Sequence, residues 1–434
     1  MDEIPSSKIQ RTSKFVKTGL KVGTNYLKHY AQKLVSGEAD TEALDKANAE
    51  DIYEALSELK GSALKAAQML SMDGNVLPSA YIEQFSKAQY QAPALSGPLV
   101  VKTFEQYFGK SPTALFDTFE LKAKHAASMG QVHQATKNGK QLAIKIQYPG
   151  VGDSVVSDLN MLKPVVKRMF GWRDADLQSY FEEVKGRLVE ETDYLLEVRR
   201  GNEIAEKCAE LPNLRFPIYL KEFSTDRIIT MEWINGLHLD AWLATQPSQE
   251  ARNLVGQTLW NFYNYQIHTL KTMHADAHPG NYLIQENGEV AILDFGCVKE
   301  FPEDFYQNYL ALMNPAIWDN EHEAELRKLC LEAKALLGNE TAEEERFFMK
   351  VFKEGVSLLC LPFYNETFDF GDKAYFQQLY EYGEGMAKDK QLRKSAPRGS
   401  QHALYLNRTY FGLYNLLHAL GATVTTRSYM PKLY

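Results

Sequence analysis

Three polar side chains between His274 and Gly296 have the types and spacing that phosphoryl transfer requires. Asp276 stands five residues before Asn281, and Asp294 opens an Asp-Phe-Gly triplet. A loop aspartate can orient or deprotonate an attacking hydroxyl or water. An asparagine and a second aspartate supply the hard oxygen ligands that magnesium prefers. The spacing therefore predicts Asp276 as the catalytic residue, with Asn281 and Asp294 as metal ligands.

A predicted β-hairpin would position the two metal ligands. Two short apolar runs, 282–284 and 290–293, flank Asn287 and Gly288, a pair typical of hairpin turns. Pairing of the two runs would bring Asn281 near Asp294. One such aspartate by itself would more often be a solvated loop residue or a helix cap, so the prediction depends on spacing and hairpin together.

A second group of residues fits nucleotide binding. Lys145 ends the run Leu142-Ala143-Ile144-Lys145, which is similar to the V-A-I-K pattern of a nucleotide-binding lysine. Antiparallel strands are expected at 119–121, 131–135 and 142–146. The turn after the first strand is rich in small residues, so its backbone N–H groups could approach phosphates closely. Its residues are Ala126, Ala127, Ser128, Met129, Gly130 and Gln131. The ordinary alternatives are a lysine that extends to solvent and a plain hairpin turn.

Three predicted helices carry charged residues. The helix over 176–209 is acidic and holds Glu191, Asp193 and Glu197, and the helix over 49–71 places Lys65 and Gln68 on one side. Most such residues would simply face solvent. Residues 4–37 contain no acidic residue and form a basic amphipathic pattern. This segment could lie on an anionic membrane surface or dock on the rest of the protein.

The remaining chain gives a largely helical second half. Strands are expected at 214–220 and 227–234, the latter carrying Glu232 and Trp233 into a hinge at Asn235 and Gly236. A long helix is expected over 250–273, and helices throughout 303–434. These patterns predict an N-terminal helical extension over 1–117, a sheet-containing lobe over 118–235 and a C-terminal lobe over 236–434.

Composition restricts the class of protein. The chain has 434 residues and a formal net charge of −8, which argues against a dedicated nucleic-acid binder. Its four cysteines are scattered without metal-ligand spacing, which favours a reducing compartment. No secretory signal and no run of about 18 apolar residues occurs. We therefore expect a soluble, cytoplasmic protein, with any membrane contact peripheral, and the sequence indicates no particular oligomeric state.

Taken together, these motifs resemble the ABC1/AarF/UbiB/COQ8 family of atypical kinases. The resemblance rests on Lys65-Ala66-Ala67-Gln68, the alanine-rich turn, Glu191-Thr192-Asp193 and the HADAHPGN stretch from His274 to Asn281. It runs from about residue 50 to the C-terminus. It implies an α+β, bilobal protein-kinase-like fold with a helical N-terminal extension and a largely helical C-terminal lobe.

The resemblance also implies roles for particular residues. Lys145 and Glu197 would form the ion pair that holds the nucleotide phosphates, with ATP and Mg²⁺ as cofactors. Lys65 and Gln68 would lie over the active site, with Lys65 facing Glu191 and Asp193. Such an arrangement favours ATPase or small-molecule kinase activity over protein phosphorylation. It implies a role in isoprenoid-quinone biosynthesis or lipid homeostasis, with a lipid or quinone precursor as ligand.

The sequence departs from the pattern, and two other functions stay open. Ala67 replaces the family's usual glycine, and Ala277 replaces a proline beside the catalytic aspartate. The first alternative is a slow, nucleotide-gated pseudokinase that binds lipid or protein. The second is a metallohydrolase in which His274, Asp276 and His278 bind zinc.

Overall fold

The computed structural model describes residues 21, 24, 41–59, 95–127, 129–170, 174–389, 391–392, 395 and 398–427. The chain divides into two compact units. The first comprises Met1–Val198 and Ile218–Trp233, and the second comprises Arg199–Pro217 and Ile234–Tyr434. Helix and sheet occur in both, which confirms the predicted α+β class. None of the helices in these described ranges is both long and apolar enough to cross a bilayer.

The first unit is built on a five-stranded antiparallel sheet in the order β1-β3-β4-β6, with β2 paired to β3. The strands are β1 (Thr118–Phe119), β2 (His125–Ala127), β3 (Gly130–Lys137), β4 (Lys140–Gln147) and β6 (Ile228–Glu232). Asn138 and Gly139 join β3 to β4, and their φ angles of 51° and 75° match the turn that follows the natural twist of a hairpin.

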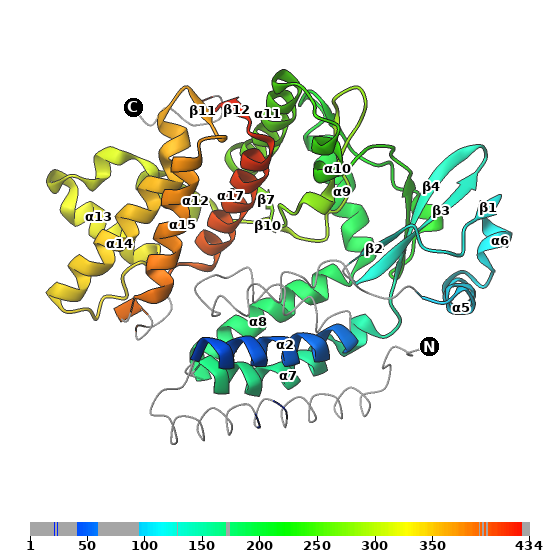
Figure 1. Ribbon diagram of the computed structural model, residues 1–434, viewed down its shortest axis with the longest axis horizontal. Coiled ribbons are helices and arrows are strands. Elements are labelled where there is room, and N and C mark those ends of the chain that lie inside the picture. Colours follow the sequence, from blue (N-terminus) through cyan, green and yellow to red (C-terminus); the bar gives the residue numbers. More distant parts are fainter. Residues whose placement is uncertain are drawn as a thin grey trace. The chain divides into compact units, whose positions relative to one another are not determined.

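Helices cover this sheet. They are α2 (Thr41–Leu59), α5 (Gly97–Phe108), α6 (Pro112–Leu115), α7 (Val151–Phe170), α8 (Asp174–Glu191) and the start of α9 (Tyr194–Lys207), with a 3₁₀ turn at Lys221–Phe223. Helices α7 and α8 lie side by side (Figure 1). Phe104 of α5, Ile144 of β4 and Leu188 of α8 are all fully buried in one apolar core. The expected helix over 176–209 is therefore two helices, separated at Thr192 and Asp193.

Among the residues that the structure describes, the second unit contains three small sheets. In the first, β5 (Leu214–Arg215) pairs in parallel with β9 (Val290–Ile292), which pairs antiparallel with β8 (Tyr282–Ile284). The others pair β7 (Thr272–His274) with β10 (Val298–Glu300), and β11 (Thr367–Asp369) with β12 (Thr423–Thr425). The predicted hairpin is confirmed, with Gly288 at a φ of 86° in its turn.

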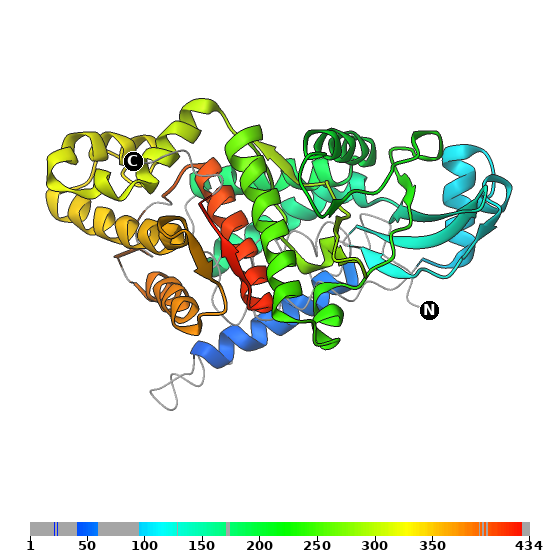
Figure 2. The same ribbon diagram turned by 90° about the horizontal axis from the view of Figure 1, so that it is seen from above.

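Most of the second unit is helical. Its helices are α10 (Leu239–Ala244), α11 (Gln249–Tyr265), α12 (Glu303–Met313), α13 (Glu323–Glu332), α14 (Ala342–Cys360), α15 (Lys373–Lys388) and α17 (Gln401–Leu420), with a π-helical turn at Gln266–Leu270. The green α11 and the red α17 run alongside each other (Figures 1 and 2). Trp260 of α11 and Tyr414 of α17 stack with ring centroids 6.3 Å apart. This contact belongs to a buried aromatic core.

Three further expected elements differ from the structure. The α-helix expected over 250–273 ends at Tyr265 and continues as the π-helical turn Gln266–Leu270. Lys271 closes that turn with a left-handed φ of 53°, which no right-handed helix continues, and β7 follows. The strand over 214–220 shortens to Leu214–Arg215, since Pro217 has no N–H to donate. Strands β11 and β12 interrupt the predicted all-helical C-terminal region, where Thr423–Thr425 is rich in β-branched residues.

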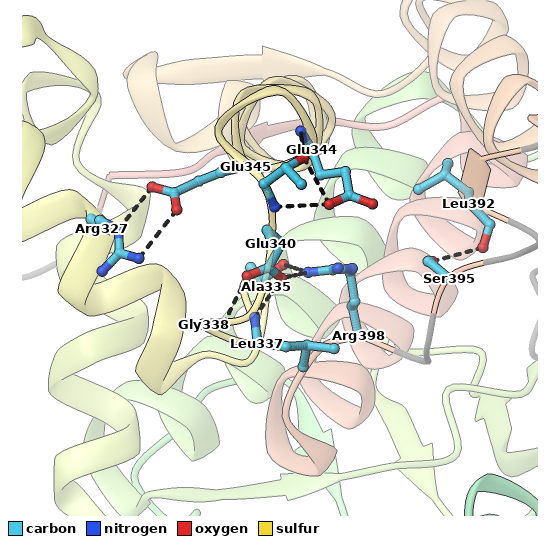
Figure 3. A network of polar contacts seen from close by, with 11 residues as sticks. Arg327, Ala335, Leu337, Gly338, Glu340, Glu344, Glu345, Leu392, Ser395 and Arg398 are labelled. Carbon is cyan, nitrogen blue, oxygen red and sulfur yellow. Dashed lines mark hydrogen bonds and ion pairs between the residues drawn. The ribbon is translucent and has the colours of Figure 1, made fainter.

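A buried ion pair ties two distant segments of the second unit together (Figure 3). Nη1 of Arg398 lies 2.5 Å from Oε1 of Glu340, and the guanidinium lies 3.3 Å from the centroid of the Phe348 ring. Glu340 also accepts hydrogen bonds from the backbone N–H groups of Leu337 and Gly338. The segment before α17 is thereby fixed to the loop before α14.

Candidate functional site

Lys145 and Glu197 form a closely paired, buried ion pair in the first unit. Nζ of Lys145 lies 2.8 Å and 3.0 Å from the two carboxylate oxygens of Glu197, and the side chains are 12% and 3% exposed. The lysine nitrogen also lies 5.2 Å from the centroid of the Tyr194 ring. A charge pair this well buried is stable only with close geometry. The structure thus brings together the two residues predicted to hold phosphates.

The sheet fixes the position of Lys145. In β4 it pairs with Val132 of β3 on one side and with Ile229 of β6 on the other. Its neighbours Ile144 and Ile146 are fully buried, so they anchor the strand while the alternating lysine points to the opposite face. The apolar pattern around Lys145 was therefore a sound signal for this strand.

The alanine-rich segment is a tight hairpin rather than an open loop. Ala126 and Ala127 lie in β2, where Ala127 pairs directly with Gly130, and Met129 is buried. A Cβ atom on Gly130 would lie 2.3 Å from the carbonyl oxygen of Ile146, so only glycine fits there. Ser128 lies outside the described residues.

The side chain of Gln131 is buried and makes hydrogen bonds within the first unit. Its side-chain oxygen accepts the backbone N–H of Leu95 at 2.6 Å, and its amide nitrogen lies 2.7 Å from Nε2 of His133. The residue is 1% exposed. Its side chain therefore points into the core of the first unit, and of this residue only the backbone lies along the hairpin.

The segment that includes Glu232 and Trp233 continues the sheet edge. Glu232 ends β6 opposite Leu142 and donates its N–H to Ile218. The N–H of Trp233 donates to Gln141 at 3.0 Å, and its ring stacks near that of His125 at 6.1 Å. The segment before the predicted hinge is thus paired to β4, the strand of Lys145.

The acidic motif lies at the junction between α8 and α9. Oδ1 of Asp193 accepts the backbone N–H of Leu196 at 3.0 Å, which is the geometry of an N-cap residue. Glu191 closes α8. Lys65 and Gln68, predicted to face this motif, lie outside the described residues, as does Ala67.

Sequence reasoning missed a bridge that holds this junction to the sheet. The side chain of Arg227 donates to Oε1 of Gln147 at 2.9 Å and to the carbonyl of Thr192 at 3.0 Å. Gln147 donates to the same carbonyl at 3.0 Å. Both residues look unremarkable in sequence, because the bridge forms between segments that lie 35 and 80 residues apart.

In the second unit, Asn281 organises the predicted catalytic loop. Its side-chain nitrogen donates to the carbonyl of Asp276 at 3.0 Å and to the carboxylate of Asp276 at 3.2 Å. Its own carbonyl accepts the N–H of Leu293 at 3.0 Å, the residue just before Asp294. Because the amide nitrogen faces Asp276, the amide oxygen faces the other way. The three residues predicted from spacing are therefore joined through one hydrogen-bonded framework.

The buried side chain of His274 contacts the Asp-Phe-Gly segment of this framework. Its Nε2 lies 2.5 Å from the carbonyl oxygen of Asp294, and its ring meets that of Phe295 edge-on at 5.7 Å. The backbone N–H of Gly296 donates to Oδ1 of Asp294 at 2.8 Å. Packing of the Asp-Phe-Gly phenylalanine sets the position of its aspartate, and the buried histidine fixes both.

Two buried tyrosines lie beneath the loop. The hydroxyl groups of Tyr263 and Tyr282 are hydrogen-bonded to each other. Burial raises the pKa of both well above the usual value, and the negative charge of Asp276 acts in the same direction. Both side chains therefore stay uncharged, and their hydroxyl groups form a neutral, buried polar contact next to the catalytic loop. Sequence analysis placed Tyr282 in an apolar run and assigned no role to Tyr263.

The zinc alternative requires a different use of the histidines. Nδ1 of His278 accepts the N–H of Gly280 at 3.0 Å, and His274 contacts Asp294 as described. Within the described ranges, no three His, Cys, Asp or Glu side chains are grouped so that they could hold a metal ion. By contrast, the amide and carboxylate oxygens of Asn281 and Asp294 are a donor set that suits Mg²⁺.

Comparisons with known proteins identify the family of this chain. The ABC1 atypical kinase-like domain matches residues 87–326, more than half of the chain. Atypical kinase COQ8B, mitochondrial, from Rattus norvegicus is 30% identical over 85% of this chain and 70% of its own length. Atypical kinase COQ8, mitochondrial, from Saccharomyces cerevisiae is 28% identical over 97% of this chain and 83% of its own length.

A solved structure extends the likeness to the fold. The Rv3197–erythromycin complex from Mycobacterium tuberculosis shares 25% sequence identity and a TM-score of 0.61, over 91% of this chain and 97% of that chain. The predicted kinase-like fold and family resemblance are confirmed. The chain belongs to the ABC1 atypical kinase-like family.

Proposed function

We propose that this protein is a Mg²⁺-dependent ATPase or small-molecule kinase. The observation that carries the proposal is the framework in which Asn281 contacts both the carbonyl and the carboxylate of Asp276 while binding the residue before Asp294. Phosphoryl transfer depends on such pre-positioned groups more than on covalent chemistry by the protein.

Each residue has a role in this proposal. Lys145, held by Glu197, would bind the nucleotide phosphates, with the backbone of the hairpin from Ala126 to Gln131 nearby in the same sheet. Glu232 and Trp233 would border the base. Asn281 and Asp294 would hold Mg²⁺, which neutralises phosphate charge when bound, and Asp276 would orient the attacking hydroxyl or water.

The test is ATP turnover by the purified chain with Mg²⁺, compared with Asp294→Asn. Loss of a metal-binding carboxylate should lower kcat at least about 100-fold, because electrostatic stabilisation is a dominant contribution in such sites. Glu286→Gln, an exposed carboxylate in the turn of the same hairpin, is the matched control. Wild-type turnover that survives Asp294→Asn would refute the metal assignment. Magnesium-dependent ATP binding without any turnover would favour the pseudokinase alternative.

The physiological substrate class is proposed from family membership. Relatives named as COQ8 kinases, and the resemblance of the motifs, support a role in isoprenoid-quinone biosynthesis or lipid homeostasis. The turnover assay should therefore include a panel of quinone precursors and anionic liposomes. Stimulation by a precursor in the wild type but not in Asp294→Asn would support this role, and no response to any of them would count against it.

Regulation and membrane contact are the remaining parts of the proposal. Lys65 and Gln68 would restrain access to the site through Glu191 and Asp193. For the basic N-terminal segment, the structure describes Lys21, whose Nζ lies 3.4 Å from Asp51 and 3.1 Å from Glu54 of α2. This contact supports docking of the segment on the protein. Equal pelleting with anionic liposomes by the intact chain and by one lacking residues 1–40 would reject peripheral membrane binding.

A further inference from the structure

Helix α17 contacts the strand and loop that carry Asp276, although more than 130 residues separate them in sequence. Oγ1 of Thr409 lies 3.5 Å from Sδ of Met273 in β7. Three residues further along the helix, at Gly412, the space beside the helix is filled by the catalytic loop. The helix therefore packs along β7 and the segment that follows it.

Gly412 is the point of closest approach. An added Cβ atom at this position would lie 2.7 Å from Cβ of Ala277 and 3.4 Å from the carbonyl oxygen of Ala277. Ala277 directly follows Asp276, and the N–H of the next residue, His278, donates back to the carbonyl of Asp276 at 2.8 Å. The methyl group of Ala277 thus occupies the space that a side chain on α17 would need.

We propose that Gly412 is a positioning residue for phosphoryl transfer. Because it has no side chain, it leaves the space that the methyl group of Ala277 occupies, and this contact fixes the position of Asp276. The inference rests on the proposed function. It also assigns a role to Ala277, one of the two positions at which the sequence departs from the pattern that it resembles.

The loop, rather than the helix, would yield to a larger residue at 412. Helix α17 begins after the N-cap residue Ser400 and ends at Gly421, which has a left-handed backbone conformation. Leu413 and Tyr414, which follow Gly412 in the helix, are buried. The atom of Ala277 that would be struck is its Cβ, which is bonded directly to the backbone, so no flexible side chain can rotate away. Relief therefore requires movement of the backbone at Asp276, where a displacement of about 1 Å can cost about 100-fold in rate.

The experiment compares Gly412→Ala with Gly383→Ala. Gly383 lies in α15, is exposed and has no atom within 4 Å of an added Cβ, so this variant controls for the higher helix propensity of alanine. Gly412→Ala should lower kcat at least about tenfold while KM for ATP stays within about threefold, because the loop moves and Lys145 does not. Gly383→Ala should match the wild type.

Rescue separates positioning from general damage. The double variant Gly412→Ala/Ala277→Gly removes the opposing methyl group and should recover the kcat of Ala277→Gly alone. Hydrogen exchange of the loop peptide around His278 and Asn281 gives a readout that needs no turnover. It should quicken in Gly412→Ala and return in the double variant.

Three outcomes would overturn the inference: a Gly412→Ala variant indistinguishable from Gly383→Ala in rate and exchange, a rate loss that Ala277→Gly does not reverse, or a loop whose exchange is unchanged. A wild type without turnover would instead reject the proposed function, and the exchange comparison would still decide the role of Gly412.

Discussion

At the scale of single residues, the stability lost on replacing Lys145 depends on whether the carboxylate of Glu197 remains. The carboxylate is 3% exposed, so it would remain as an uncompensated charge if the lysine were removed. Breaking a buried pair is strongly destabilising, whereas replacing both members with apolar residues is often neutral. Stability and nucleotide binding should therefore respond differently to the same substitutions.

We predict that Lys145→Met lowers the free energy of unfolding by about 3 kcal/mol, measured by urea denaturation. The double variant Lys145→Met/Glu197→Leu should recover most of this loss. Both variants should fail to bind ATP in calorimetry, because neither has the ammonium group. A double variant as unstable as the single one would show that the charge of Glu197 is not the cause.

At the scale of elements, the alanine-rich hairpin is held together by its glycine. Ala127 and Gly130 are directly paired, and the carbonyl of Met129 accepts the N–H of Tyr148 at 2.9 Å. The turn is therefore fixed against β4, where any side chain at residue 130 would strike the backbone. The small residues serve close packing of strands as well as the predicted approach to phosphates.

We predict that Gly130→Ala costs at least about 2 kcal/mol in unfolding free energy, because overpacking against a backbone atom forces the strands apart. Thermal unfolding measures the loss, and ATP affinity should fall with it. The control is Gly186→Ala in α8, where an added Cβ meets nothing within 4 Å. Equal melting temperatures for the two variants would contradict this account.

At the scale of the whole molecule, stability at low pH should depend on the ion pair that closes the second unit. Burial by itself would raise the pKa of Glu340, but hydrogen bonds from backbone N–H groups and from the Arg398 guanidinium lower it to about 2. A glutamate in the unfolded chain has a pKa of about 4.3. The unfolded chain therefore binds the proton first as pH falls, so the stabilisation is complete above about pH 5 and is lost towards pH 2.

We predict that Glu340→Gln lowers the unfolding free energy at pH 7 by about 3 kcal/mol, since it leaves Arg398 without its partner. The difference from the wild type should shrink as pH falls from 5 towards 2. Glu354→Gln, in a surface pair with Lys350 at 3.9 Å, should change little. A difference that stays constant across this range would contradict the assigned titration.

Short-range signals in the amino-acid sequence predicted the local chemistry. Asp276, Asn281 and Asp294 were predicted from spacing, and their hairpin was predicted from Asn287 and Gly288, because turn chemistry and strand alternation are short-range effects. Lys145 was predicted from its apolar neighbours for the same reason. Periodicity also predicted helices and strands, whereas the kinase-like fold was implied by the resemblance of the motifs to a known family.

Contacts between residues distant in the chain could not be predicted and are known from the three-dimensional fold. The bridge from Arg227 to Thr192, the buried environment of Gln131 and the contact of Gly412 with Ala277 join segments far apart in the chain. No local propensity encodes such contacts. They arise because close packing admits one arrangement of the elements, and that arrangement assigns a structural use to residues that look ordinary in sequence.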